Sequence, residues 1–237
     1  MCRSALIIGS GNSTELLLNY GFDKIPDDVD AYCCSLAFRY CEELNWWPEY
    51  YVSLDPKTNY DQRDNFNRLI SDPDNPVLKW YMFTHNDWFV EFDDPHGNII
   101  AARWEKTGAG AFYYALKSGK YSKIMMIGLD NNSWWDSSLL EKVNDGKKSN
   151  NRFRYIKDVD KHPMYFWPGY IKKGDIVTWN YRSRKQKTYH DNVPKRIDEY
   201  ILEAENAGIE VVDFSDNKLN TNKTKDIGFH LGRKLEE

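Results

Sequence analysis

The sequence predicts an α/β fold: a doubly wound, mainly parallel sheet with helices between its strands. An apolar run at residues 4–8 leads into a Gly-Ser-Gly-Asn-Ser turn (residues 9–13), and a helical pattern follows. A second apolar run at 123–130 follows a helical stretch, and an amphipathic stretch at 193–207 precedes a last apolar run. Short continuous apolar runs are typical of strands buried on both faces, and their alternation with helices is typical of parallel sheets.

The first half of the chain alternates strands with helices. Pro56 ends one expected strand, because proline cannot donate to a sheet ladder. Residues 86–103 fit either a hairpin or an aromatic loop. The expected strands are 4–8, 29–35, 50–56 and 77–83. One expected helix begins at residue 14, and two more are expected at 37–44 and 59–70.

The second half repeats this pattern around one long exception. A Thr-Gly-Ala-Gly sequence at 107–110 leads a helix, and the strand at 123–130 follows it. Residues 144–189 show little periodicity but much lysine, asparagine and aromatic content, and long irregular stretches in a domain are usually functional. We therefore expect an irregular, lid-like insertion there. A helix at 193–207 and a strand at 209–215 complete the fold.

Length and charge favour a single domain over residues 1–237 and argue against several classes of protein. At 237 residues the chain can bury one sizeable core. A net charge of −4 gives no basic surface for nucleic acid, and no apolar run is long enough for a transmembrane segment. The four cysteines form no Cys-x-x-Cys pair, so we expect reduced thiols in a cytoplasmic protein.

Aromatic side chains are unusually frequent, with 9 Trp, 16 Tyr and 11 Phe. Several lie among polar residues, as Trp46 and Trp47 do. Rings in polar loops are used to recognise sugars and bases, but they also anchor long loops to a core. Both interpretations stay open at each position.

The turn at residues 9–13 is a candidate ligand site. Its glycines let the backbone turn sharply and direct free N–H groups at a ligand, and the helix that follows adds a partial positive charge. This pattern favours a phosphate or carboxylate; a purely structural turn is the alternative. The turn lacks the third glycine of a dinucleotide fingerprint and the lysine of a P-loop. At the end of the later strand, Asp130 and Asn131 are candidates for binding a ribose or sugar hydroxyl, or for forming a turn.

Three segments together resemble one family, the small bacterial CMP-sialic-acid-dependent sialyltransferases that build lipooligosaccharide, with their Rossmann-like relatives. The first segment is the strand that runs into residues 9–13. The second runs from residue 107 to a Gly-Leu-Asp sequence at 128–130, where the family has a Ser-Gly-led helix and a strand ending in Gly-Ile-Asp. The third is a His-Asp-Asn sequence at 190–192, where the family places its catalytic histidine before one helix and one strand.

The resemblance implies a glycosyltransferase that moves a sugar from a cytidine-nucleotide donor to a glycan acceptor. His190 would be the general base for the acceptor hydroxyl, and Tyr165 or Tyr170 would donate to the leaving phosphate without a metal. The nucleotide sugar is the substrate, and we expect no cofactor. The candidate nucleotide-binding residues, from the turn, the strand ends and the resemblance, are Gly9, Ser10, Gly11, Asn12, Ser13, Ser35, Asp55, Thr107, Gly108, Gly110, Asp130 and Asn131.

Some positions depart from the family pattern. A serine offers only a hydroxyl and an aspartate cannot donate, whereas an asparagine amide does both. The family's three nucleotide-binding asparagines align here with Ser10, Ser35 and Asp55. Its paired tyrosines have three candidates, Tyr155, Tyr165 and Tyr170.

Two other kinds of function stay open. Archaeal pterin pyrophosphokinases and flagellin-glycosylation factors share the superfamily shape, and a kinase of that type needs acidic metal ligands, for which Asp55 and Asp130 are candidates. The other is an inactive nucleotide- or glycan-binding module, which the lost asparagines favour and His190 opposes. Two Asp-x-Asp patterns, at 28–30 and 158–160, match metal-dependent glycosyltransferases, but we interpret both as solvated charge.

Overall fold

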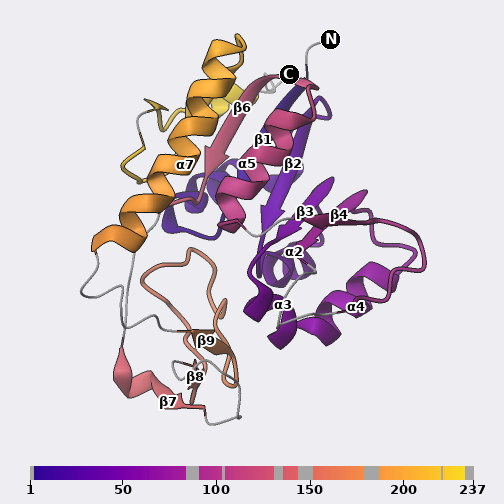
Figure 1. The fold of residues 1–237 in the computed structure, drawn as a ribbon, viewed down its shortest axis with the longest axis vertical. Coiled ribbons are helices and arrows are strands. Elements are labelled where there is room, and N and C mark those ends of the chain that lie inside the picture. Colours follow the sequence, from indigo (N-terminus) through magenta and orange to yellow (C-terminus); the bar gives the residue numbers. More distant parts are fainter. Residues whose placement is uncertain are drawn as a thin grey trace.

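Eight strands form one parallel sheet, as the alternation of strands and helices predicts. The computed structural model in Figure 1 describes residues 3–83, 91–102, 105–130, 136–143, 152–178, 187–219 and 221–232, with the backbone alone at 137, 178 and 187–195. In spatial order the strands are β11 (Asn222–Lys223), β10 (Glu210–Asp213), β6 (Tyr121–Ile127), β1 (Arg3–Ile8), β2 (Val29–Cys34), β3 (Tyr50–Ser53), β4 (Lys79–Phe83) and β5 (Ile99–Ala102).

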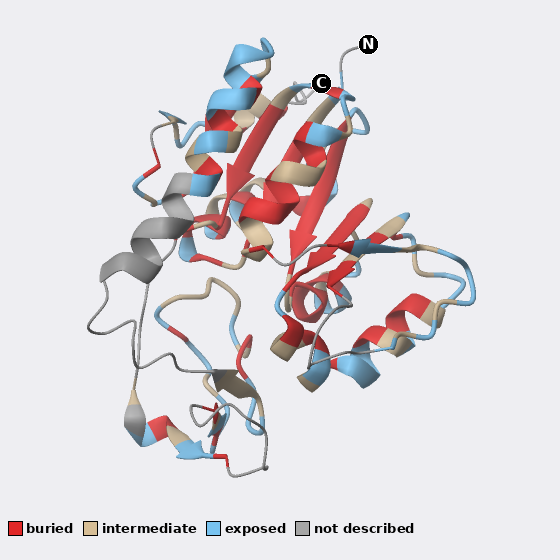
Figure 2. Ribbon diagram, in the orientation of Figure 1, coloured by how far each residue is buried: buried red, intermediate tan, exposed pale blue. Residues whose placement is uncertain are grey.

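The central strands are buried on both faces, which explains their continuous apolar sequences. Along β1, Leu6 and Ile8 belong to one cluster of the core, and Ala5 and Ile7 belong to the other. Figure 2 shows these strands as buried segments between layers of helices. One face is covered by α1 (Glu15–Tyr20), α2 (Phe38–Leu44), α4 (Arg63–Ser71) and α8 (Ile227–Leu231), and the other by α5 (Thr107–Lys117) and α7 (Lys187–Asn206).

The sheet has a topological switch point between β1 and β6. From β1 the chain adds β2 to β5 in one direction, and it then returns through α5 to place β6 on the other side of β1. Ile8 pairs with Cys33 of β2 and with Ile127 of β6, so the three strands end together. The architecture is therefore Rossmann-like, and its carboxyl edge is where such sheets bind ligands.

A small antiparallel sheet lies beyond the carboxyl edge, at the bottom of Figure 1. It consists of β7 (Leu140–Lys142), β8 (Arg152–Tyr155) and β9 (Ile176–Thr178). Because β8 and β9 fall within residues 144–189, this segment is more regular than expected. Strands of three or four residues are too short to show a period, so the sequence pattern missed them.

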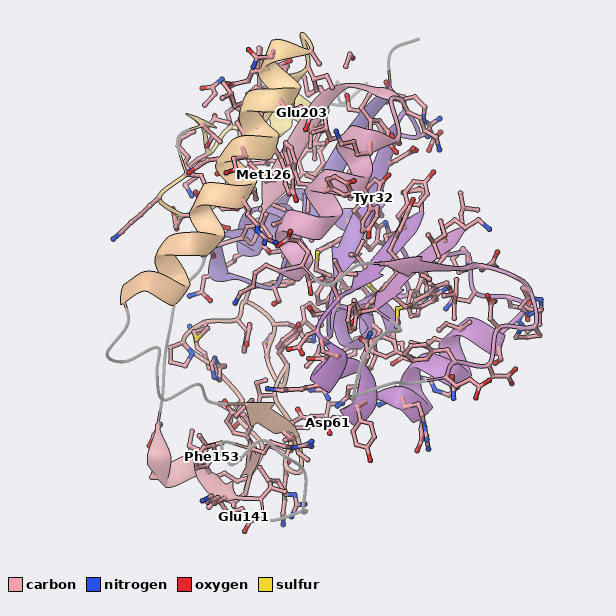
Figure 3. All side chains as sticks on the ribbon, in the orientation of Figure 1. Tyr32, Asp61, Met126, Glu141, Phe153 and Glu203 are labelled. Atoms are coloured by element: carbon pink, nitrogen blue, oxygen red, sulfur yellow. The ribbon has the colours of Figure 1, made fainter. Side chains whose placement is uncertain are left out.

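Two buried ion pairs join this small sheet to the large one. Arg152 of β8, at 1% exposure, contacts Asp61 at the end of α3 (Pro56–Asp61) with an N–O distance of 2.6 Å. Figure 3 shows Asp61 at the boundary between α3 and the small sheet. Arg39 of α2 forms two hydrogen bonds with the carboxylate of Asp175, at 2.5 and 2.7 Å. The small sheet is thus fastened to helices on one face of the core.

Three helical segments differ from the sequence expectation. The helix expected at 59–70 is two helices, α3 and α4, because Gln62 leaves helical geometry and Asn59 is held by the carbonyls of Ser53 and Phe83. The last long helix was expected to begin at residue 193, and this prediction was wrong, because α7 begins at Lys187. The short helix α8 near the end of the chain was not expected. Among the described residues, none of the helices combines the length and apolar character that crossing a membrane requires.

Candidate functional site

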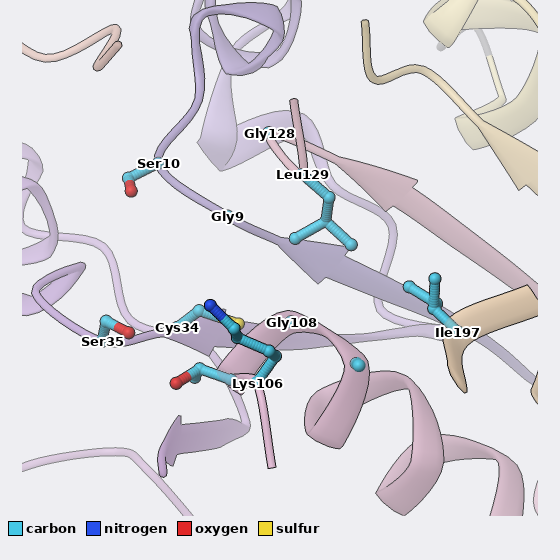
Figure 4. A pocket seen from close by; sticks show the side chains of 11 residues that line it. Gly9, Ser10, Cys34, Ser35, Lys106, Gly108, Gly128, Leu129 and Ile197 are labelled. Carbon is cyan, nitrogen blue, oxygen red and sulfur yellow. The ribbon is translucent and has the colours of Figure 1, made fainter. Parts of the chain in front are cut away.

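A cleft of about 200 Å³ opens at the switch point, between the ends of β1 and β6 and the start of α5 (Figure 4). It is lined by the ends of β1, β2 and β6 with the residues that follow them, by the start of α5 and by one residue of α7. Its lining consists of Gly9, Ser10, Cys34, Ser35, Lys106, Thr107, Gly108, Ala109, Gly128, Leu129 and Ile197.

The turn at residues 9–13 is held against the end of β6. Gly9 N–H donates to Ile127 O at 2.8 Å, and Gly11 N–H donates to Gly128 O at 2.9 Å. Thr14 N–H closes the turn on Gly11 O at 3.0 Å. The expectation that the glycines of this turn direct free N–H groups at a ligand was therefore wrong for Gly9 and Gly11, because the end of β6 and the residue after it supply their acceptors.

Asp130 lies behind the turn and stabilises it. Its carboxylate accepts from Ser13 N–H at 2.8 Å, from the Ser13 hydroxyl at 2.5 Å and from Asp216 N–H at 2.8 Å. The side chain is 5% exposed and does not line the cleft. The sequence left two roles open for Asp130, binding a ligand hydroxyl and forming a turn, and these contacts place it in turn formation.

Close packing explains why several of these positions are glycines. A Cβ at Gly9 would collide with the carbonyl oxygen of Gly128, and one at Gly108 would lie 2.6 Å from a methyl group of Leu129. The backbones after β1 and β6 and at the start of α5 approach one another more closely than side chains allow. These glycines bring three elements together around the cleft.

The start of α5 presents backbone donors to the cleft. The first intrahelical bond joins Gly110 N–H to Lys106 O at 2.8 Å, and none of the described side chains caps this end of the helix. In the described part of the chain, the N–H groups of Thr107, Gly108 and Ala109 have no acceptor. All three residues line the cleft, and such an uncapped terminus with its partial positive charge favours an anion.

Lys106 adds a cationic side chain to this lining, and our sequence interpretation missed it. Figure 4 shows the side chain extending into the space between the ends of β1 and β2 and the start of α5. Its position directly before the Thr-Gly-Ala-Gly sequence was the available signal, because a lysine at a helix start complements an anion site. Only the chain crossing from β5 to α5 shows that it faces the switch point.

Glu105 fastens the start of α5 to α7. Its side chain is 6% exposed and accepts from Arg196 at 3.0 Å and from the Tyr200 hydroxyl at 3.2 Å. The same carboxylate accepts from Lys106 N–H at 3.1 Å. These contacts connect the cleft to the helix that carries His190.

The described part of the lid-like insertion contacts the turn directly. Phe166 N–H donates to Ser10 O at 3.2 Å, and the Asn12 amide donates to Pro163 O at 2.8 Å. Tyr165 packs between the rings of His162 and Tyr170, with both centroid distances at 4.6 Å and the ring planes tilted by 32° and 41°. These three tilted rings, called the aromatic stack below, lie beside the turn.

Burial changes the ionisation of this stack. It raises the pKa of Tyr170, an effect that a hydrogen bond with the Ser10 side chain partly offsets, and it also raises the pKa of Tyr165. Burial lowers the pKa of His162 to about 4. His162 Nδ1 accepts from Met164 N–H at 3.1 Å, as a neutral imidazole does. At neutral pH the stack is thus uncharged, with both tyrosine hydroxyls protonated.

The structure brings together part of the predicted site. Asp55 is exposed and caps α3 by accepting from Lys57 N–H at 2.9 Å. Asn131 and the side chain of His190 lie outside the described residues; the backbone of His190 falls in the first turn of α7. The predicted residues that line the cleft are Gly9, Ser10, Ser35, Thr107 and Gly108, and the described ones that do not are Gly11, Asn12, Ser13, Asp55, Gly110, Asp130, Tyr165 and Tyr170.

The two Asp-x-Asp patterns, at 28–30 and 158–160, lie in different environments. Asp30 is 4% exposed and is bonded by Arg3 and by the Tyr121 hydroxyl, so the interpretation of this residue as solvated charge was wrong. Asp158 and Asp160 are exposed, as expected. Within the described ranges, no group of three or more His, Cys, Asp or Glu side chains is placed to hold a metal ion.

The chain matches no family model, no curated protein and no solved structure. The resemblance to sialyltransferases therefore stays a prediction, which depends on the three sequence segments alone. What the structure adds is the cleft at the switch point, its backbone donors and its lysine.

Proposed function

We propose that this cleft binds the phosphate of a nucleotide-linked sugar and that the protein transfers the sugar to a glycan acceptor. One observation carries the first half of the proposal. The N–H groups of Thr107, Gly108 and Ala109 have no acceptor among the described residues, and these three residues line the same cleft as Lys106, at the switch point of a Rossmann-like sheet. A phosphate oxygen satisfies these donors, and the lysine balances its charge.

The donor that we propose is a cytidine nucleotide linked to a sugar, as the resemblance implies. Ser10 and Ser35 face the cleft where the family has asparagines, and their hydroxyls contact the nucleotide there. The cleft is small, which suits a single phosphate better than the pyrophosphate of a dinucleotide. Glycans and nucleotide sugars are the expected partners, and the transfer needs no cofactor.

In the proposed reaction, His190 removes the proton of the acceptor hydroxyl. The acceptor oxygen then forms a bond to the anomeric carbon, and the bond between that carbon and the phosphate oxygen breaks. The backbone of His190 lies in the first turn of α7, seven residues before Ile197, which lines the cleft. Tyr170 does not line the cleft, and its hydrogen bond with Ser10 links it to the phosphate site only through that serine.

Calorimetry with CMP, CMP-N-acetylneuraminic acid, ATP and NAD tests the binding step. The cytidine ligands should bind best, and Lys106→Met should weaken their binding about 10- to 100-fold, since a hydrogen bond to a charged group is worth about 1.5–3 kcal/mol. Lys24→Met is the matched control, because Lys24 is exposed and does not line the cleft. Binding of ATP or NAD without CMP, or unchanged affinity in the Lys106 variant, would refute the proposal.

Turnover separates catalysis from simple binding. His190→Ala should lower sugar transfer by about two to four decades while donor affinity changes little, because the base acts on the acceptor. His96→Ala, at an exposed histidine outside the cleft, should leave the rate unchanged. Activity should survive EDTA. Cytidine-ligand binding without any transfer would instead assign the chain as an inactive binding module.

A further inference from the structure

A second, larger groove lies at the opposite edge of the sheet. Trp46 and Trp47 stand between the end of α2 and the start of β3, and residues 72–76 stand between α4 and β4. Segments that lead from a helix into a parallel strand lie at the amino edge, away from the switch-point cleft. The groove encloses about 540 Å³, within the range of roughly 300–1,000 Å³ typical of ligand sites.

Two half-buried tryptophans form the apolar part of this amino-edge groove. The ring of Trp46 packs against the ring of Phe22, with their centroids 4.9 Å apart. The indole N–H of Trp47 has no acceptor among the residues that the structure describes. Each ring offers a flat apolar surface, and Trp47 adds a donor at its edge. Saccharides need this combination, because their rings have apolar C–H faces and hydroxyl rims.

The polar part of the groove consists of hydrogen-bonding side chains on both sides. Glu42 and Arg68 form an ion pair at 2.5 Å, and Asp72 accepts from Asp74 N–H at 3.0 Å. In the described part of the chain, the Asp74 carboxylate itself has no donor. Asn45 and Asn75 add amides that donate and accept. Carboxylates and amides of this kind match the vicinal hydroxyl groups of a sugar.

The charge of the groove selects among saccharides. Three carboxylates, those of Glu42, Asp72 and Asp74, face one guanidinium, that of Arg68. The guanidinium is already paired with Glu42, so the surplus charge is negative. Acidic sugars such as sialic and uronic acids would be repelled, whereas neutral sugars would bind without a charge penalty.

We propose that the amino-edge groove is a binding site for neutral oligosaccharides, separate from the switch-point cleft. Trp46 and Trp47 stack on the sugar rings, and Asp74 and the asparagine amides bind their hydroxyl groups. The site goes beyond sugar transfer, since it lies at the other edge of the sheet and contains none of the residues assigned to that reaction.

Calorimetry and tryptophan fluorescence with maltotriose, chitotriose, lactose and 3′-sialyllactose test the proposal. At least one neutral oligosaccharide should bind, sialyllactose should not, and saturating CMP should leave the affinity unchanged. Trp47→Ala and Asp74→Asn should each weaken binding about tenfold or more, whereas Phe229→Ala, at an exposed ring outside the groove, should not.

Asp74→Asn keeps the test decisive if Trp47→Ala does not fold, because Asp74 is exposed and the change is isosteric. The proposal is overturned if no neutral oligosaccharide binds at millimolar concentration. Tighter binding of sialyllactose than of lactose, or full affinity in the Asp74 variant, would overturn it equally. These results are independent of nucleotide binding, which the Lys106 variant reports separately.

Discussion

At the scale of single residues, burial decides which ionisable groups near the cleft carry charge. His162 is 3% exposed, with one ring nitrogen bonded to Met164 N–H and the other 3.4 Å from the Tyr155 hydroxyl. Tyr170, on the other side of Tyr165, is 2% exposed and stays protonated because burial raises its pKa. The aromatic stack beside the turn therefore depends on a neutral imidazole.

The lowered pKa of His162 predicts a loss of stability in mild acid. The His162 imidazole takes up a proton at pH about 6.5 in the unfolded chain and only at about 4 in the folded chain. Its contribution to the free energy of unfolding is therefore fully present above pH 6.5 and is lost as the pH falls from 6.5 to 4. At pH 4.5 the loss from this residue should be about 2–3 kcal/mol. Urea unfolding of the wild type and of His162→Gln at pH 7 and 4.5 measures it. Equal losses in the two proteins would contradict the assignment.

At the scale of elements, the cleft exists because three backbone segments meet without side chains between them. The turn after β1 lies against the end of β6, and the start of α5 lies against Leu129. Gly9 and Gly108 make this approach possible. The lack of a side chain at Gly108 also lets the start of α5 reach the switch point. The glycines therefore both permit the close packing and place the backbone N–H donors of α5 at the cleft.

Gly9→Ala should destabilise the fold by about 3 kcal/mol, because its Cβ would collide with the backbone carbonyl of Gly128, which cannot move without breaking the turn. Gly119→Ala is the comparison. Its Cβ would meet no described residue within 4 Å, and its φ of +67° imposes conformational strain, worth about 1–2 kcal/mol. Chemical denaturation gives both values. A Gly9 variant as stable as the Gly119 variant would show that the approach is looser than the structure has it.

At the scale of the whole molecule, two buried ion pairs set the position of the small sheet beside the carboxyl edge. Arg39 is 7% exposed in its side chain and bonds both Asp175 and the carbonyl of Tyr170. Arg152 bonds Asp61 from the other side. The segment that carries the aromatic stack is therefore tied to α2 and α3, and these contacts hold it beside the turn at residues 9–13.

Asp175→Ala should cost about 3–5 kcal/mol, because it leaves the buried guanidinium of Arg39 without its carboxylate. Asp64→Ala removes an ion pair whose partners are 55% and 91% exposed, and it should cost less than about 1 kcal/mol. Denaturation measures the stability, and hydrogen exchange over residues 152–178 reports whether the segment loosens. Unchanged exchange in the Asp175 variant would mean that other contacts position the segment.

Much of the fold could be predicted because its signals are local. The apolar runs that became β1, β2 and β6 and the turn at residues 9–13 were recognised from neighbouring residues alone. The short strands β8, β9 and β11 were missed, since two to four residues show no period. The break between α3 and α4 was missed because Asn59 bonds to the ends of β3 and β4, which adjacent residues do not reveal.

The sequence by itself determined the α/β alternation and the place of the first turn, because hydrophobic period and glycine are properties of adjacent residues. Only the tertiary structure decided which groups face the cleft. Ser13 contacts Asp130, which lies 117 positions later in the chain. Asp130, a candidate ligand-binding residue in the sequence, therefore stabilises the turn in the structure. The folded chain likewise gives the N–H groups of Gly9 and Gly11 acceptors from β6 and leaves those at the start of α5 without one among the described residues. Whether a polar group is occupied or available depends on partners that only the packing of distant segments supplies.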